Sequence, residues 1–152
     1  MDIRYAKESD ESQILALLDQ LISEVNLRGG FTKSTEGETP RRKIFKEMMA
    51  RKDTIMIVAE EKGKLLGFVD FFIMPIVRRG YYNVHIEDFV VDESARGKGV
   101  GTAILKKVVS LCKEKGFKVV KLDSGLELTS AHKFYEKNGF KFTEKMFRLD
   151  II

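Results

Sequence analysis

The sequence is short of several residue types, and each shortage excludes a class of protein. Only one cysteine is present, Cys112, so the chain cannot form an internal disulfide. There is no run of about 18 apolar residues and no recognisable signal or transit peptide, so we expect no membrane association and a cytoplasmic location. Tryptophan is absent and no stretch interleaves aromatic with basic residues, which argues against binding of nucleic acid.

An excess of charge of one sign is also missing, because 27 basic residues stand against 23 acidic ones and leave a net charge of +4. This small excess is typical of a solvated surface with some affinity for anions. At 152 residues with 43% hydrophobic content, the chain is long enough for one core and too short for a second. The sequence therefore predicts a single domain over residues 1–152.

Hydrophobic periodicity divides the chain into strands and helices. Apolar runs rich in β-branched and aromatic residues predict strands, and apolar residues spaced three or four apart predict helices. The expected strands are residues 1–5, 54–60, 65–74, 81–91, 118–122 and 140–149. The expected helices are a first one that Gly29-Gly30 ends, a second that has Thr39 as its N-cap, and two more over 101–115 and 129–138. Because a strand, a helix and a strand follow one another between 81 and 122, the second of these strands should lie parallel to the first.

The most informative stretch is a glycine-rich loop between a predicted strand and a predicted helix. It reads Arg96-Gly97-Lys98-Gly99-Val100-Gly101 and follows Phe89-Val90-Val91. Three glycines in so short a stretch allow backbone N–H groups to turn towards an anion, and the N-terminus of the next helix adds a partial positive charge. A P-loop requires Ser or Thr after Gly-Lys, and a dinucleotide-binding loop requires glycine where Thr102 stands, so neither motif is present. The loop predicts binding of another phosphate-bearing ligand.

Two separated motifs resemble those of the GNAT N-acetyltransferase superfamily. The Arg-x-x-Gly-x-Gly pattern that starts at Arg96, after a Val-Val-Asp strand end, resembles the acetyl-CoA pyrophosphate loop of that family. Residues 131–140, Ala-His-Lys-Phe-Tyr-Glu-Lys-Asn-Gly-Phe, resemble its Ala-x-x-Phe-Tyr-x-x-x-Gly-Phe signature. The resemblance implies an α/β (α+β) fold in which four helices cover a mixed, mostly antiparallel sheet of about six to seven strands. It also implies a split in the sheet between the strand ending near Val91 and the strand ending near Leu122.

The same resemblance implies acetyl-CoA as the co-substrate and requires no metal. The N–H groups from Gly97 to Gly101, with Arg96 at the start of the loop, would hold the pyrophosphate. The backbone of Val90 and Val91 would pair with the pantetheine arm as a pseudo-strand. The residues implied in cofactor binding are Phe89, Val90, Val91, Arg96, Gly97, Lys98, Gly99, Val100, Gly101 and Thr102. The chain departs from the family at Leu128, three residues before Ala131, where the family often has asparagine.

Acetyl transfer to an amine needs a base, because an alkylammonium group with a pKa of about 10.4 is protonated at neutral pH. Glu87 and Asp88 are the carboxylates available to take that proton, directly or through a water. Their side chains should point to opposite faces of the strand unless a bulge intervenes, and we choose Glu87. Tyr135 stands where the resemblance places a general acid for the departing thiolate. Further candidate substrate contacts are His85, Asp88, Arg78 and Tyr82.

The sequence leaves the acceptor open. The first hypothesis is a primary amine of a small molecule, acetylated by direct transfer in a ternary complex in a pocket formed by residues 29–38 and 75–82. A peptide amine, either a lysine side chain or an N-terminus, would require a broad groove in place of a closed pocket. The alternative from another class is a non-catalytic acyl-CoA-binding regulatory module, against which Glu87 and Tyr135 argue. The sequence does not determine the oligomeric state, and a homodimer is one alternative.

Overall fold

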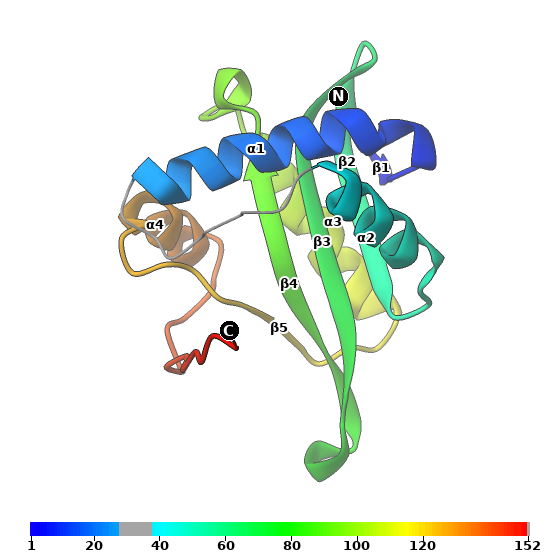
Figure 1. The fold of residues 1–152 in the computed structure, drawn as a ribbon. Coiled ribbons are helices and arrows are strands. Elements are labelled where there is room, and N and C mark those ends of the chain that lie inside the picture. Colours follow the sequence, from blue (N-terminus) through cyan, green and yellow to red (C-terminus); the bar gives the residue numbers. More distant parts are fainter. Residues whose placement is uncertain (28–37, 152) are drawn as a thin grey trace.

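The computed structural model describes residues 1–27 and 38–151, which form one five-stranded sheet with helices on both faces (Figure 1). The strands are β1 (Asp2–Tyr5), β2 (Thr54–Glu61), β3 (Lys64–Ile76), β4 (Tyr81–Val91) and β5 (Val119–Leu122). Their order in the sheet is their order in the chain, with antiparallel pairing from β1 to β4. β5 pairs with β4 in parallel, so the predicted parallel pair is confirmed.

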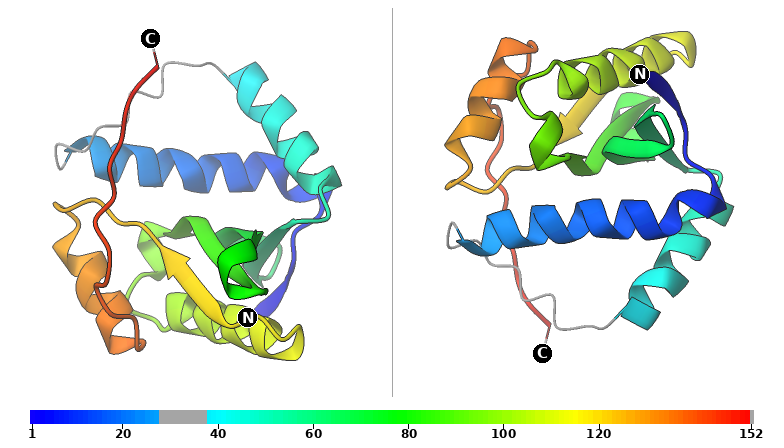
Figure 2. Two further views of the ribbon diagram at one scale, coloured as in Figure 1. Left: turned by 90° about the horizontal axis from the view of Figure 1, so that it is seen from below. Right: turned by 90° about the horizontal axis from the view of Figure 1, so that it is seen from above.

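The helices lie in two layers. α1 and α2 cover one face of the sheet, and α3 and α4 lie on the other (Figure 2). The bounds are α1 (Glu11–Leu27), α2 (Glu38–Ala50), α3 (Val100–Glu114) and α4 (Thr129–Lys137). Three 3-10 turns complete the described chain, at η1 (Glu8–Asp10), η2 (Val77–Arg79) and η3 (Glu93–Ala95). Within residues 1–27 and 38–151, no helix is long and apolar enough to cross a membrane.

Alternation along the strands sends side chains into two core clusters, one on each face of the sheet, and not into the one core that the length of the chain predicts. The α3-side core includes Ile57, Val69, Phe71, Ile86, Ile104 and Val108. The α1-side core includes Ile14, Phe45, Met56, Val58, Phe68 and Val90. Burying one such side chain contributes roughly 1.5–3 kcal/mol, so the two cores hold the helices firmly against the sheet.

The strands β4 and β5 part in the middle of β4. Their pairing covers residues 83–86 of β4 and 119–122 of β5, and it stops there. From Glu87 to Val91, β4 has β3 on one side and, in the part of the chain that the structure describes, no strand on the other. This is the split in the sheet that the resemblance implies, and it leaves one edge of β4 open.

A β-bulge lies at the point where the strands part. On β3, Asp70 stands alone opposite two residues of β4, Glu87 and Asp88. The residues that flank the bulge, Ile86 and Phe89, both contact the α3-side core. The side chains of Glu87 and Asp88 therefore lie together on the side away from that core. We expected them on opposite faces of the strand unless a bulge intervened, and the bulge is present.

Glycines in the left-handed region of φ set both ends of α3. Gly99, with φ 84°, occupies the N-cap position, and Gly116, with φ 73°, follows the last turn. The Phe117 N–H donates to the Cys112 carbonyl at 2.9 Å, which is the long hydrogen bond of a Schellman motif. Gly116 is thus the C-terminal cap that the sequence predicts.

The predicted closing strand over residues 140–149 is wrong. The described chain forms no strand after α4, so the sheet has five strands and not six to seven. A strand needs a neighbour for its backbone hydrogen bonds, and the link of this segment to β5 is a side-chain ion pair, 2.7 Å between Lys121 and Glu144. Large apolar side chains of the predicted strand are exposed to solvent: Phe142, Met146, Phe147 and Leu149.

The helix ends differ from prediction by small amounts. α2 begins at Glu38, so Thr39 lies inside the helix and is not its N-cap. α4 begins after Leu128, whose side chain makes no capping hydrogen bond. α1 ends at Leu27, and the Gly29-Gly30 pair, like residues 31–37 of the expected acceptor pocket, lies outside the described residues.

Candidate functional site

The glycine loop forms the turn between η3 and α3. Gly97 and Gly99 have φ values of 73° and 84°, which glycine adopts without strain. A Cβ atom at either position would have nothing within 4 Å, so the space beside the loop is open. The first N–H groups of α3, from Val100 to Thr102, have no partner inside the helix and carry the positive end of its dipole. This arrangement can bind an anion.

Gly101 joins the loop to the neighbouring elements. A Cβ atom there would lie 3.1 Å from the Phe134 ring and 3.4 Å from Val91, which is too close for a side chain without displacement. The start of α3 is therefore packed directly against α4 and the end of β4. Tyr135, next to Phe134 on α4, is held by the same packing as the loop.

The two basic side chains of the loop bind the protein itself. Arg96 donates from Nε to the Val91 carbonyl at 3.1 Å, and its Nη2 lies 3.0 Å from a carboxylate oxygen of Glu24 on α1. Lys98 donates from Nζ to the Ser94 carbonyl at 2.8 Å. A cavity of about 480 Å³ lies beside Arg96, between α1 and η3. Arg96 is thus anchored where the open edge of β4 meets α1.

The backbone at the end of β4 alternates between β3 and the open side. The Asp92 N–H donates to the Leu66 carbonyl on β3 at 2.9 Å. Alternation then turns the N–H and C=O groups of Val91 and Phe89 to the open side and those of Val90 towards β3. Of the predicted backbone contacts to a ligand, the geometry therefore favours Phe89 and Val91 and disfavours Val90.

His85 stands between two carboxylates beside the bulge. Its Nε2 lies 4.0 Å from a Glu87 carboxylate oxygen and 3.3 Å from one of Asp123. His85 and Glu87 thus share a face of β4. Sequence reasoning missed Asp123. The pairing of the two predicted parallel strands could have indicated that it lies near His85. His85 pairs with Lys121, and the residue two beyond Lys121 returns to the same face.

Sequence reasoning also missed Asp70, which is only 3% exposed. Its Oδ1 accepts a hydrogen bond from the Asp88 N–H at 2.7 Å. Burial, together with the negative charges of Asp88 and Glu87, raises the pKa of Asp70 to about 7. Burial also raises the pKa of Asp88 to about 6, with Glu87 adding to the rise and Arg41 of α2 opposing it. Near neutral pH the two aspartates therefore hold part of a proton between them.

Tyr135 lies against the open part of β4. Its ring centroid is 6.3 Å from that of Phe89, and the rings of Phe134 and Phe140 lie 5.5 and 5.7 Å away. The Phe140 N–H donates to the Tyr135 carbonyl at 3.0 Å across the turn at Gly139, which presses Phe140 onto the tyrosine. Burial raises the pKa of Tyr135 to about 12. The phenol is therefore protonated at physiological pH and available as a proton donor.

Two candidate substrate contacts lie far from the carboxylates. Arg78 belongs to η2, and Tyr82 pairs with Pro75 in the part of the β3–β4 hairpin that projects from the sheet (Figure 1). At about 3.3 Å per residue, Tyr82 is roughly 16 Å from Glu87 along the strand. The structure brings Glu87, Asp88, His85 and Tyr135 together where β4 and β5 part, and it leaves Arg78 and Tyr82 at the hairpin end of β4.

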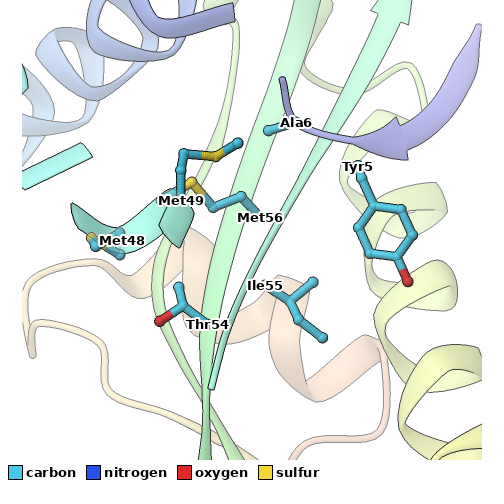
Figure 3. A pocket seen from close by; sticks show the side chains of 7 residues that line it. All are labelled: Tyr5, Ala6, Met48, Met49, Thr54, Ile55 and Met56. Atoms are coloured by element: carbon cyan, nitrogen blue, oxygen red, sulfur yellow. The ribbon is translucent and has the colours of Figure 1, made fainter. Parts of the chain in front are cut away.

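A second, smaller cavity lies at the opposite edge of the sheet. It has a volume of about 190 Å³ and separates Met48 and Met49 of α2 from β1 and β2, with Tyr5 and Met56 also in its wall (Figure 3). The lining contains no carboxylate and no histidine. This cavity therefore lacks the groups for proton transfer that surround the bulge.

The sequence and the fold are similar to those of known proteins. Residues 18–140, which include the glycine loop and Tyr135, match the sequence profile of the acetyltransferase (GNAT) family. The chain is 33% identical to a glucosamine 6-phosphate N-acetyltransferase of Trypanosoma brucei brucei, over 99% of this chain and 96% of that protein. It is 32% identical to a thialysine N-epsilon-acetyltransferase of Mus musculus, over 87% of this chain and 81% of that protein. A crystal structure of an acetyltransferase of Trypanosoma brucei superimposes with a TM-score of 0.76 at 31% identity, over 99% of each chain.

Proposed function

Because the chain belongs to the acetyltransferase (GNAT) family of acetyl-CoA-dependent N-acetyltransferases, we propose that it acetylates a primary amine of a small molecule. The acetyl group passes directly to the amine while both substrates are bound. The observation that carries this proposal is the β4 bulge. It puts Glu87 and Asp88 on one side of the strand at the point where β4 loses its neighbour β5.

The glycine loop and the open edge of β4 fit acetyl-CoA as the co-substrate, which supplies an acetyl group activated as a thioester. The N–H groups from Gly97 to Thr102, at the positive end of α3, hold the pyrophosphate. The backbone groups of Phe89 and the Val91 N–H, which face the open side, pair with the pantetheine arm as a strand would, while the Val91 carbonyl accepts from Arg96. This pairing leads from the loop along β4 towards the two carboxylates.

The side chains of Asp88, Glu87, Tyr135 and His85 bind the substrate amine or transfer protons. Asp88 attracts the substrate ammonium group, and Glu87 takes a proton from it, directly or through a water. The amine nitrogen then forms the new carbon–nitrogen bond as the carbon–sulfur bond breaks, and the nitrogen loses its second proton to solvent. Tyr135 donates its phenolic proton to the departing sulfur and regains one from solvent. His85, 4.0 Å from Glu87, lies where it can pass the proton on.

A small acceptor is supported by the relatives. Their names give glucosamine 6-phosphate and thialysine as the molecules they acetylate, and both are small molecules with a primary amine. These two compounds are therefore the first acceptors to test.

The proposal is tested by measuring thiol release from acetyl-CoA with one acceptor at a time. The panel contains glucosamine 6-phosphate, thialysine, polyamines, aminophosphonates, aminoglycosides and a lysine-containing peptide. We expect turnover with at least one small amine, and mass spectrometry should show its acetylated product. Acetylation of the peptide alone would contradict the small acceptor. Acetyl-CoA binding by calorimetry without any turnover would contradict catalysis and support a binding module.

Glu87→Gln is expected to slow turnover about 100-fold or more at pH 7, because removing a general base typically costs two to four orders of magnitude. The deficit should shrink as the pH rises towards 10, since a growing fraction of an amine with a pKa of about 10.4 is then already neutral. The measurement is kcat between pH 6.5 and 9.5 with the best acceptor of the panel.

The matched control is Glu114→Gln, which removes an exposed carboxylate at the end of α3, far from the bulge. It should leave the whole profile unchanged. A flat profile with normal activity for Glu87→Gln would move the role of base to another residue, and Asp88→Asn would then be measured in the same way.

A further inference from the structure

Asp70 is a charged residue type inside an apolar strand segment. It stands between Phe68-Val69 and Phe71-Phe72 on β3, and its side chain is almost fully buried. A carboxyl group in such a place is costly unless it has hydrogen-bond partners. The partner that the structure gives it is the backbone N–H of Asp88, 2.7 Å away.

The bulge explains why this N–H needs a side-chain acceptor. Asp88 is one of two β4 residues opposite Asp70, so the regular ladder of backbone hydrogen bonds is interrupted at this place. Alternation turns the Asp88 N–H towards β3, into the interior of the sheet. A buried N–H without an acceptor costs about 1–3 kcal/mol, so the bulge depends on a group that can fill the gap.

The proposal rests on the acetyl transfer proposed above. We propose that Asp70 is a positioning residue for that reaction: its carboxyl group fixes the β4 bulge through the Asp88 N–H and so holds the Glu87 and Asp88 side chains on the acceptor side of the strand. Asp70 does not touch the reacting atoms. It sets the geometry of the residues that do.

The charges around Asp70 make this anchor sensitive to pH. Glu87 and Asp88 face it from β4, Arg41 of α2 acts on the Asp88 end, and Met56 of β2, its pairing partner on the other side, is uncharged. The pKa of Asp70 is about 7. The carboxyl group therefore changes from neutral to ionised as the pH rises through neutrality, while one of its oxygens can accept the hydrogen bond in either state.

Two substitutions separate the anchoring role from simple burial. Asp70→Ala removes the acceptor, and we expect kcat to fall about 100-fold, because a displacement of about 1 Å in a catalytic group can cost that much. The KM for acetyl-CoA should stay unchanged, since the glycine loop is untouched. Asp70→Asn keeps an oxygen for the Asp88 N–H and should restore kcat to within about threefold of the wild type.

The control for lost stability is Val58→Ala, at a fully buried position of β2 in the α1-side core. It should lower the melting temperature and leave kcat unchanged. A wild-type kcat in Asp70→Ala, or an Asp70→Asn variant as slow as Asp70→Ala, would overturn the inference.

An NMR titration gives a readout that does not depend on catalysis. The Asp88 amide proton should shift as the pH passes through about 7 in the wild type; in Asp70→Asn this component should disappear and only the titration of the Asp88 carboxyl group itself should remain. The internal control is the Lys7 amide, which donates to Asp10 at 2.8 Å. The pKa of Asp10 is lowered by Arg4, so the Lys7 amide should shift only in the acidic range.

The two proposals fail in different ways. If the Asp88 amide titrates as described but the protein acetylates no amine, the proposed function is contradicted and the anchoring role of Asp70 is not. An active wild type together with an equally active Asp70→Ala variant would overturn the anchor alone.

Discussion

Gly99→Val is expected to weaken acetyl-CoA binding at least about 100-fold, which corresponds to roughly 2.7 kcal/mol. Two effects add. The φ of 84° is unfavourable for a β-branched residue, so the turn changes conformation and its N–H groups no longer point at the bound anion. The new side chain would also project into the open space beside the loop, where a Cβ atom has no neighbour within 4 Å and where we place the pyrophosphate. Calorimetric titration with acetyl-CoA measures the change directly.

Gly116→Val provides a matched control at the other end of the same helix. Gly116 has a φ of 73° and equally open surroundings, so valine there introduces similar backbone strain. Both variants should lose about 1–2 kcal/mol of stability, and only Gly99→Val should lose affinity. Affinity within about threefold of the wild type for Gly99→Val would remove the loop from the binding site.

Tyr135→Phe is expected to lower kcat by about 100-fold while the dissociation constant for acetyl-CoA stays within about twofold. Phenylalanine keeps the ring contacts to Phe89, Phe134 and Phe140, so the change removes the hydroxyl group and little else. The rate falls because the departing thiolate no longer receives a proton. Single-turnover rates together with calorimetry separate the two parameters.

The pH profile adds a second test of Tyr135. A general acid loses activity as the pH rises past its pKa, and burial raises the pKa of Tyr135 to about 12. The wild-type rate should therefore show no decline from this group up to about pH 10. Tyr5→Phe, at an exposed position on β1, is the control and should behave as the wild type. Equal rates for Tyr135→Phe and Tyr5→Phe would reduce Tyr135 to a packing residue.

Much of the fold could be predicted because local signals and tertiary contacts agree. The helical spacing of Ile104, Leu105 and Val108 predicts α3, and these residues are buried in the α3-side core. The segment 140–149 shows that local sequence patterns alone do not predict a strand reliably. Its aromatic and aliphatic residues favour a strand, but a strand forms only beside another strand, and no sequence pattern states that a neighbour is present.

The candidate site was predicted in its parts and not in its geometry. Glu87, Asp88 and Tyr135 could be selected from their chemistry and from the resemblance of two motifs. Asp70 carried a signal, because an ionisable residue inside an apolar run predicts a buried polar group with a dedicated partner. The bulge carried none, since it depends on how β3 and β4 align, and alignment is a property of two strands together.

The carboxyl pair under the bulge also acts as a local proton buffer. With pKa values of about 7 and 6, Asp70 and Asp88 carry less than their full negative charge in neutral solution. A cationic acceptor favours the ionised form of both groups, so we expect its binding to be accompanied by the release of part of a proton.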